Sequence, residues 1–87
     1  MRKASWRLKL SAVAGELYSL ARRESREAAS VANAMADELR KIVWTEPRIP
    51  KKHLKDILTV IESGVKSKMV RHPKKWKKIA REIRRIL

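Results

Sequence analysis

The scarcity of helix-breaking residues constrains the fold of this chain more than any other feature. Between Ser5 and Trp44 there is no proline, and Gly15 is the only glycine. At about 100° per residue, the apolar residues of this stretch fall on one stripe roughly 80–100° wide. The stripe consists of Trp6, Leu10, Val13, Leu17, Leu20, Ala28, Val31, Met35, Leu39 and Ile42. No segment alternates between apolar and polar residues as a strand does, so we expect an all-α protein.

The apolar stripe keeps its phase through the charged residues 22–27, RRESRE. Two unrelated helices joined by a loop would have no reason to preserve that phase. We therefore predict one long helix over residues 5–44, about 60 Å long at 1.5 Å per residue. The alternative is a break near Ser25, which could serve as the N-cap of a second helix.

Prolines mark the elements that follow. Residues 45–49 form a connector, and Pro50 suits the first turn of a second helix over residues 50–63, with Gly64 as its C′ residue. Pro73 opens a third helix over residues 73–87. We expect residues 1–87 to form a single small basic helical domain, in which the two shorter helices pack against the long one.

Two features of the predicted long helix suggest a partner. Glu24 lies within the apolar stripe, where it must either be exposed or meet a cation across an interface. The alanine-rich residues 28–36 contribute little apolar area and allow another backbone to approach closely. We therefore expect the long helix to extend past the other two and to meet a second copy of the chain or other proteins of a large assembly.

The charge of the chain is strongly basic and uneven. Its 23 Lys and Arg and 9 Asp and Glu residues leave a net charge of +14. Residues 1–44 carry nine basic and five acidic residues (+4), whereas residues 45–87 carry fourteen and four (+10). Self-repulsion at this charge density favours a polyanionic partner, because phosphates supply the missing counter-charge.

The predicted phosphate-binding residues lie mainly in the second half. The final helix is the strongest candidate, since its apolar residues occupy one arc and its basic residues roughly the other half of the wheel. The predicted nucleic-acid-binding residues are Arg48, Lys51, Lys52, Lys55, Lys66, Lys68, Arg71, Lys74, Lys75, Lys77, Lys78, Arg81, Arg84 and Arg85, together with Arg2, Lys3 and Arg7 near the N-terminus.

The three tryptophans carry different predictions. Trp6 and Trp76 lie in apolar stripes and are expected to be core or interface anchors rather than base-stacking residues. Trp44 falls about 160° from the stripe at 100° per residue. It could either cover the connector at Pro47 or stack, exposed, on an unpaired base.

Several function classes lack their sequence signals. There is no cysteine, no carboxylate spacing suited to zinc near His53 or His72, and no phosphate loop or nucleophile elbow. We therefore expect no enzyme, no metal and no cofactor. No run approaches the roughly 18 apolar residues of a membrane span, and the basic N-terminal segment is interrupted by Arg7 and Lys9, unlike a signal peptide. We expect a cytoplasmic protein with no membrane partner.

The favoured function is a small structural RNA-binding protein, most plausibly an rRNA-binding component of a ribosome or another ribonucleoprotein, where small basic helical proteins are common. The alternative is a chromatin or virion protein that compacts DNA as a homodimer. The two basic helices do not fit a helix-turn-helix motif well, because the gap from Gly64 to Pro73 is longer than the tight turn of that motif. The lack of glutamine and the single asparagine, Asn33, tilt the source toward a thermophile.

Overall fold

The computed structural model describes residues 5–66 and 70–87, which within that part of the chain form four helices and no strand. The helices are α1 (Trp6–Ala21), α2 (Arg26–Thr45), α3 (Lys51–Lys66) and α4 (Pro73–Ile86). The prediction of an all-α protein is confirmed.

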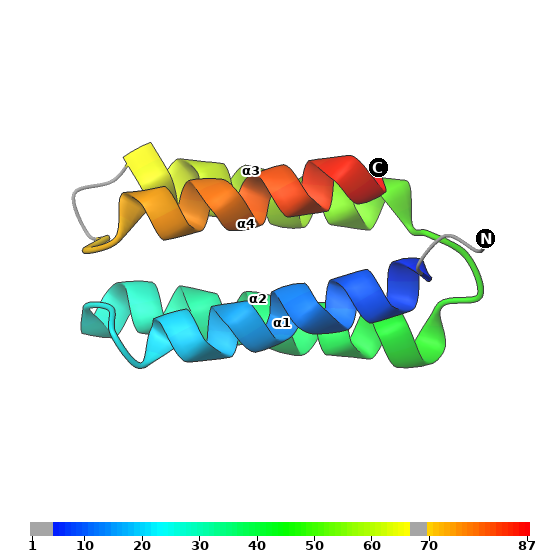
Figure 1. The fold of residues 1–87 in the computed structure, drawn as a ribbon, viewed down its shortest axis with the longest axis horizontal. Helices are drawn as coiled ribbons and strands as arrows, with labels where there is room; N and C mark the ends of the chain where they lie inside the picture. The colour runs from blue at the N-terminus through cyan, green and yellow to red at the C-terminus, as the bar shows by residue number, and fades with distance from the viewer. Residues whose placement is uncertain (1–4, 67–69) are drawn as a thin grey trace.

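The four helices are arranged as two antiparallel hairpins that lie against each other (Figure 1). One hairpin is α1 and α2, the other is α3 and α4, and successive helices run in opposite directions along the long axis. The molecule measures 40 × 23 × 20 Å. The α1–α2 turn, the end of α3 and the start of α4 lie at the same end, and the connector between the hairpins lies at the opposite end (Figure 1).

The prediction of one long helix over residues 5–44 is wrong, and the break near Ser25 is what forms. α1 ends at Ala21, and Ser25 takes an extended conformation with φ −59° and ψ 162°. Its hydroxyl accepts a hydrogen bond from the Ala28 N–H at 3.3 Å and so caps α2. A helix of about 60 Å would also exceed the 40 Å length of the whole molecule.

The continuous phase of the apolar stripe has a simple explanation. The residues between α1 and α2 are numbers 22–25, and four residues correspond to about one helical turn. The stripe therefore resumes near its old phase even though the chain has reversed direction. Phase alone cannot distinguish a continuous helix from a turn of this length.

The buried face of α2 also differs from the predicted stripe. Ala28, Ala32 and Ala36, spaced four residues apart, are buried, whereas Val31 and Met35 are only partly buried. Small side chains at this spacing let two helices approach closely, and α2 packs against α1 of the same chain. These three alanines are therefore buried within the chain, and a second copy or another protein against the rest of α2 stays a prediction.

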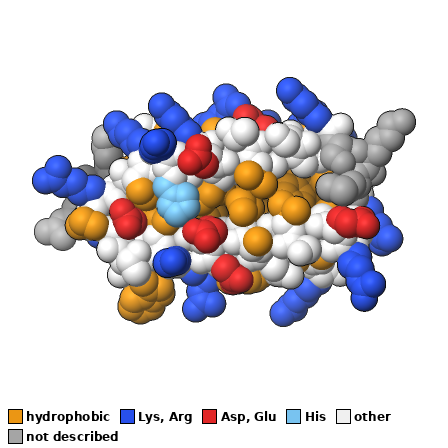
Figure 2. Space-filling view, turned by 180° about the vertical axis from the view of Figure 1, so that it is seen from behind, with side chains coloured by type: hydrophobic (Ala, Val, Ile, Leu, Met, Phe, Trp, Pro, Cys, Tyr) orange, Lys and Arg blue, Asp and Glu red, His pale blue; other side chains and the backbone are white. Residues whose placement is uncertain are grey.

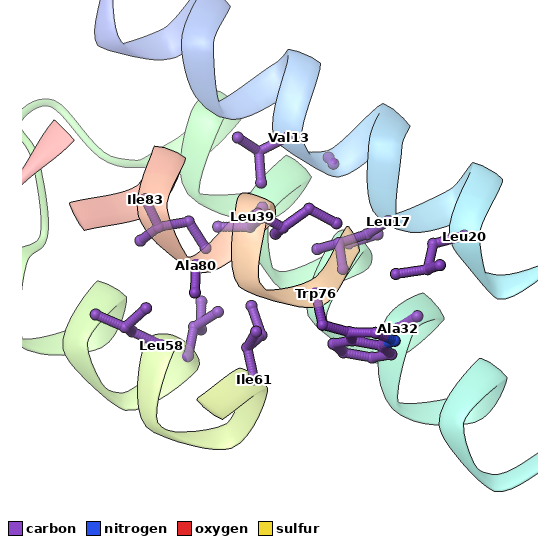
Figure 3. Packing of buried hydrophobic residues seen from close by; sticks show 14 of the residues in the cluster. Val13, Leu17, Leu20, Ala32, Leu39, Leu58, Ile61, Trp76, Ala80 and Ile83 are labelled. Atoms are coloured by element: carbon purple, nitrogen blue, oxygen red, sulfur yellow. The ribbon is translucent and has the colours of Figure 1, made fainter. Parts of the chain in front are cut away.

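One hydrophobic core lies between the two hairpins. Figure 3 shows Val13, Leu17, Leu39, Ile61 and Ile83 pointing inward from the four helices. Trp76 is fully buried among them, as expected for a core anchor. Burial of each large apolar side chain stabilises the fold by about 1.5–3 kcal/mol relative to exposure, so the apolar arc of α4 is needed to close this small core.

The bounds of the last two helices are close to those predicted, with one correction. α3 continues past Gly64 to Lys66, so Gly64 is not a C′ residue. No glycine of the described chain has a positive φ. The helix continues because Val65 beyond the glycine packs against the core. α4 begins at Pro73, as predicted, and ends one residue earlier, at Ile86.

Glu24 joins the two hairpins at the end where both turns lie. It is 8% exposed, and its carboxylate accepts hydrogen bonds from the N–H groups of Arg71 (2.6 Å) and His72 (2.9 Å). The Trp76 indole N–H adds a third bond at 3.0 Å. Glu24 is thus not exposed, and no described residue forms an ion pair with it, contrary to the expectation from the sequence. Free N–H groups at the start of α4 satisfy it instead.

Candidate nucleic-acid interface

α4 carries the densest group of exposed cations in the structure. At 100° per residue, its buried residues Trp76, Ile79 and Ile83 define an inner side, and basic residues occupy most of the remainder, which Glu82 interrupts. All seven basic residues of the helix are exposed: Lys74, Lys75, Lys77, Lys78, Arg81, Arg84 and Arg85. We refer to these seven residues as the α4 ridge.

A groove runs along the side of the ridge that faces α3. It has a volume of about 640 Å³. Its lining combines an apolar base with four cations and one carboxylate. The lining residues are Glu62, Val65, Lys66, Lys77, Ala80, Arg81 and Arg84. The Arg84 guanidinium donates to the Glu62 carboxylate, and both side chains are partly exposed. The groove is thus a cationic channel with one internal counter-ion.

A second groove, of about 420 Å³, lies on the other side of the ridge against α1. Lys75 and Lys78 from α4 line it together with Arg23 and Glu16. Burial is the largest cause that raises the pKa of Glu16, and the neighbouring Glu82 carboxyl adds to the rise through a hydrogen bond and charge repulsion. Lys78 opposes the rise. The α4 ridge therefore has a cation-lined groove on each side.

Arg23 was missed by sequence reasoning, which assigned the first half of the chain no phosphate-binding role beyond its N-terminal cations. Arg23 is exposed in the α1–α2 turn and reaches the second groove because the hairpins place that turn beside the start of α4. A local signal was present, since Arg22 and Arg23 lie side by side in the sequence directly after α1. Its proximity to α4 depends on tertiary structure.

The other predicted nucleic-acid-binding residues lie in different parts of the structure. Arg48, Lys51, Lys52 and Lys55 are exposed in the connector and the first half of α3, toward the opposite end of that helix from Lys66. Arg71 is exposed directly before α4, while its backbone N–H binds Glu24. The predicted residues Arg2, Lys3 and Lys68 lie outside the described residues.

Arg7 has a structural role in the α1–α2 hairpin. Its guanidinium donates to the carbonyl oxygens of Val43 (3.0 Å), Glu46 (2.7 Å) and Pro47 (3.2 Å), where α2 ends. It also lies 4.4 Å from the centroid of the Trp6 ring. The donors of Arg7 thus satisfy carbonyls that the last turn of a helix leaves free. The structure does not bring Arg7 together with the α4 ridge.

The face formed by α2 and α3 differs from the ridge. Figure 2 shows hydrophobic side chains along the middle of this face, Asp and Glu side chains among them, and Lys and Arg toward the edges. Val31 and Met35 are partly buried, and Val60 is 40% exposed. Glu38 pairs with His53 at 3.3 Å between the two helices. Phosphates would therefore be attracted to the ridge rather than to this face.

Trp44 is 81% exposed, and it lines an open groove at the connector together with Arg7 and Pro47. It also lines a groove of about 270 Å³ on the α1–α2 hairpin together with Tyr18, Arg40 and the small residues Ala14 and Gly15. This groove is not part of the α4 ridge. Stacking of Trp44 on a base stays a prediction.

The described residues include no group of three or more histidine, cysteine or acidic side chains that could hold a metal ion. Within the same part of the chain, no helix combines the length and the apolar character that crossing a membrane requires.

Comparison with known proteins assigns the chain to no family. No family model matches it, and neither a curated protein nor a solved structure is significantly similar to it. Its class is therefore described by its architecture alone: a small four-helix protein with a basic ridge flanked by two grooves. A functional proposal depends on the geometry and charge of that ridge.

Proposed function

We propose that this chain is a small structural nucleic-acid-binding protein that neutralises phosphates through the α4 ridge and performs no catalysis. One observation carries the proposal: α4 has 14 residues, of which seven are exposed cations. Of these, Arg84 alone forms an ion pair with a carboxylate among the described residues. So many like charges on one side of a helix repel each other, and a row of phosphates relieves that repulsion while releasing condensed counterions.

RNA is the favoured nucleic acid, and an rRNA site within a ribonucleoprotein is the favoured setting. The buried Trp76, Ile79 and Ile83 hold α4 on the core while its cations face outward, which supports binding to a phosphate backbone of either kind. Such a surface braces a phosphate backbone without reading bases. DNA is the alternative, and it shares the same phosphate chemistry.

The proposal is tested by reversing charge on the ridge. Lys74, Lys75, Lys77 and Lys78 are changed together to Glu, and affinity for an rRNA hairpin and for duplex DNA is measured by fluorescence anisotropy over a series of salt concentrations. A matched variant reverses four exposed cations of the other hairpin: Lys9, Arg22, Arg40 and Lys41. Both variants lower the net charge from +14 to +6, because each reversal removes two charges.

We expect the ridge variant to lose at least about 100-fold in affinity and the matched variant far less. Wild-type binding should weaken steeply with salt, with a slope of roughly −5 to −6 if six or seven duplex phosphates are contacted. Equal losses in both variants would show that net charge rather than the ridge governs binding. Absence of wild-type binding to either nucleic acid would refute the proposal, and co-sedimentation with ribosomal subunits tests the setting.

A further inference from the structure

The groove between α3 and α4 contains its own anion. Four cations line it, Lys66, Lys77, Arg81 and Arg84, and Glu62 is the single carboxylate among the lining residues. Even with Glu62 ionised, the lining keeps a net charge of +3, from four positive charges and one negative charge. The groove is therefore still attractive to an anion after its internal pair has formed.

The Glu62–Arg84 pair is accessible to a competitor. The Glu62 side chain is 38% exposed and that of Arg84 is 59% exposed. An ion pair with this exposure is worth little, about 0–1 kcal/mol in measured cases, which corresponds to at most about fivefold in an equilibrium. A phosphate that also reaches Lys77 and Arg81 has more cationic partners than the Glu62 carboxylate has in the pair. The balance therefore favours replacement of the carboxylate by a phosphate.

We propose that the α3–α4 groove is a site for a phosphodiester group of the bound nucleic acid, and that Glu62 occupies this site as an internal substitute until the phosphate displaces it from Arg84. This inference rests on the proposed function and adds a specific site to it. The apolar base formed by Val65 and Ala80 lets the backbone lie close to the helices. The surrounding lysines and arginines supply the donors that phosphate oxygens accept.

Glu62 acts in this scheme as a built-in competitor. It lowers affinity for any phosphate in the groove by a small, constant factor, and it keeps Arg84 oriented across the groove when the nucleic acid is absent. Removing the carboxylate should therefore tighten binding, because the phosphate no longer has to displace it from Arg84.

Glu62→Gln tests this role against Asp56→Asn. Asp56 lies on the same helix and is exposed, but it does not line the groove, so both variants remove one negative charge from α3. We expect E62Q to bind an RNA hairpin about three- to fivefold more tightly at low salt and to leave the slope of the salt dependence unchanged, because the phosphate reaches Arg84 in both proteins. D56N should change affinity less than about twofold and leave the slope unchanged.

A double-mutant cycle with Arg84→Gln adds a second measurement. R84Q should weaken RNA binding more in the E62Q background than in the wild type, because Glu62 no longer occupies the guanidinium. If wild type binds RNA but E62Q and D56N behave alike, the internal-competitor inference is overturned while the proposed function stands. If neither wild type nor E62Q binds nucleic acid, the proposed function itself fails.

Titration with inorganic tripolyphosphate, followed by the amide resonances of α3 and α4, examines the groove without nucleic acid. Saturable shifts at Val65, Lys66, Ala80 and Arg81, stronger in E62Q, would support a phosphate site there. Shifts spread evenly over all exposed lysines would overturn it. Binding of E62Q to phosphatidylglycerol vesicles but not to RNA would overturn the assignment of the phosphate to nucleic acid.

Discussion

Among individual residues, Glu24 shows how one buried charge can set the relation between two hairpins. It belongs to the α1–α2 turn, yet its oxygens accept from two backbone N–H groups at the start of α4 and from the Trp76 indole. Burial alone would raise the pKa of Glu24. The N–H groups of Arg71, Trp76 and His72 outweigh it and lower the pKa below its ordinary value of 4.5. The carboxylate therefore favours the folded state in its ionised form.

Glu24→Gln should destabilise the protein by roughly 2–3 kcal/mol, since hydrogen bonds to a charged group are replaced by weaker ones and an amide donor faces other donors. The measurement is urea denaturation at neutral pH. Glu27→Gln is the matched control, because Glu27 is exposed in the first turn of α2 and contributes at most about 0.3–1 kcal/mol through the helix dipole. Equal losses in the two variants would contradict the role of Glu24.

The lowered pKa of Glu24 also predicts an acid dependence. A carboxyl whose folded pKa is depressed stabilises the fold above its unfolded value of 4.5 and loses that effect as the pH falls through the folded value. The stability difference between wild type and E24Q should therefore shrink progressively below about pH 4.5. A difference that stayed constant down to strongly acid pH would show that the ionised carboxylate is not what stabilises the fold.

The pKa of Glu16 is shifted in the opposite direction to that of Glu24. Burial first, and Glu82 second, raise its pKa, so the folded state binds this proton more tightly than the unfolded chain does. Stability should increase as the pH falls through the folded pKa of Glu16 toward the unfolded value of 4.5. Glu16→Gln should raise the melting temperature at neutral pH and remove this increase. Thermal melts from neutral to mildly acid pH test the prediction, and a loss of stability in the variant at neutral pH would contradict it.

At the scale of the helices, a capping residue determines where some helices begin or end, and packing against the core determines it at others. Of the two alternatives for the first 44 residues, one long helix or a break near Ser25, the break forms because the Ser25 hydroxyl accepts a hydrogen bond from the Ala28 N–H and caps α2. Gly64, by contrast, does not end its helix although glycine often does so. It sits within α3 rather than after it, because the core contact of Val65 outweighs the tendency of glycine to end a helix.

Gly15→Ala and Gly64→Ala should each stabilise the protein by about 0.5–1 kcal/mol. Both glycines are helical, neither has a positive φ, and an added Cβ meets nothing within 4 Å. The two gains should add, because the sites lie on different helices. Ala34→Gly in α2, at an exposed position, should lose a similar amount, and urea denaturation of all three variants provides the comparison. A destabilising Gly64→Ala would place the end of α3 at the glycine after all.

For the molecule as a whole, a high net charge is confined to a small volume, and the resulting repulsion opposes folding. The net charge is +14 on a body of 40 × 23 × 20 Å. At about 10 mM salt the screening length is roughly 30 Å, longer than two of these dimensions, whereas at about 100 mM it is roughly 10 Å. Nearly all the cations therefore repel one another at low salt, and the repulsion opposes the packing of two hairpins around a small core.

The melting temperature should therefore rise when salt is increased from about 10 to about 300 mM, and it should rise further with a saturating polyphosphate. The fourfold Lys→Glu variant of α4, at +6, should show a shallower dependence on salt. Scanning calorimetry of both proteins tests this. A salt dependence that was identical in the two would show that the excess charge does not limit stability.

The sequence contained much of the fold but not its arrangement. The all-α class, the proline-opened start of α4 and the burial of Trp76 followed from periodicity and local chemistry. The single long helix did not hold, because a four-residue turn preserves helical phase and only contacts between hairpins show that the chain reverses. Within the chain, Ala28, Ala32 and Ala36 of the alanine-rich segment are buried in the core, and α2 packs against α1.

For the candidate site too, some features follow from the sequence and others only from the tertiary structure. Composition and helical spacing by themselves determined that the basic residues of α4 would form one face, because residues on one helix have fixed relative directions. Only the tertiary structure decided that Arg23 would join Lys75 and Lys78, that Arg7 would be used to hold α2, and that Glu62 would lie among four cations. Those relations depend on the packing of separate helices, which long-range burial of apolar side chains sets and local spacing does not encode.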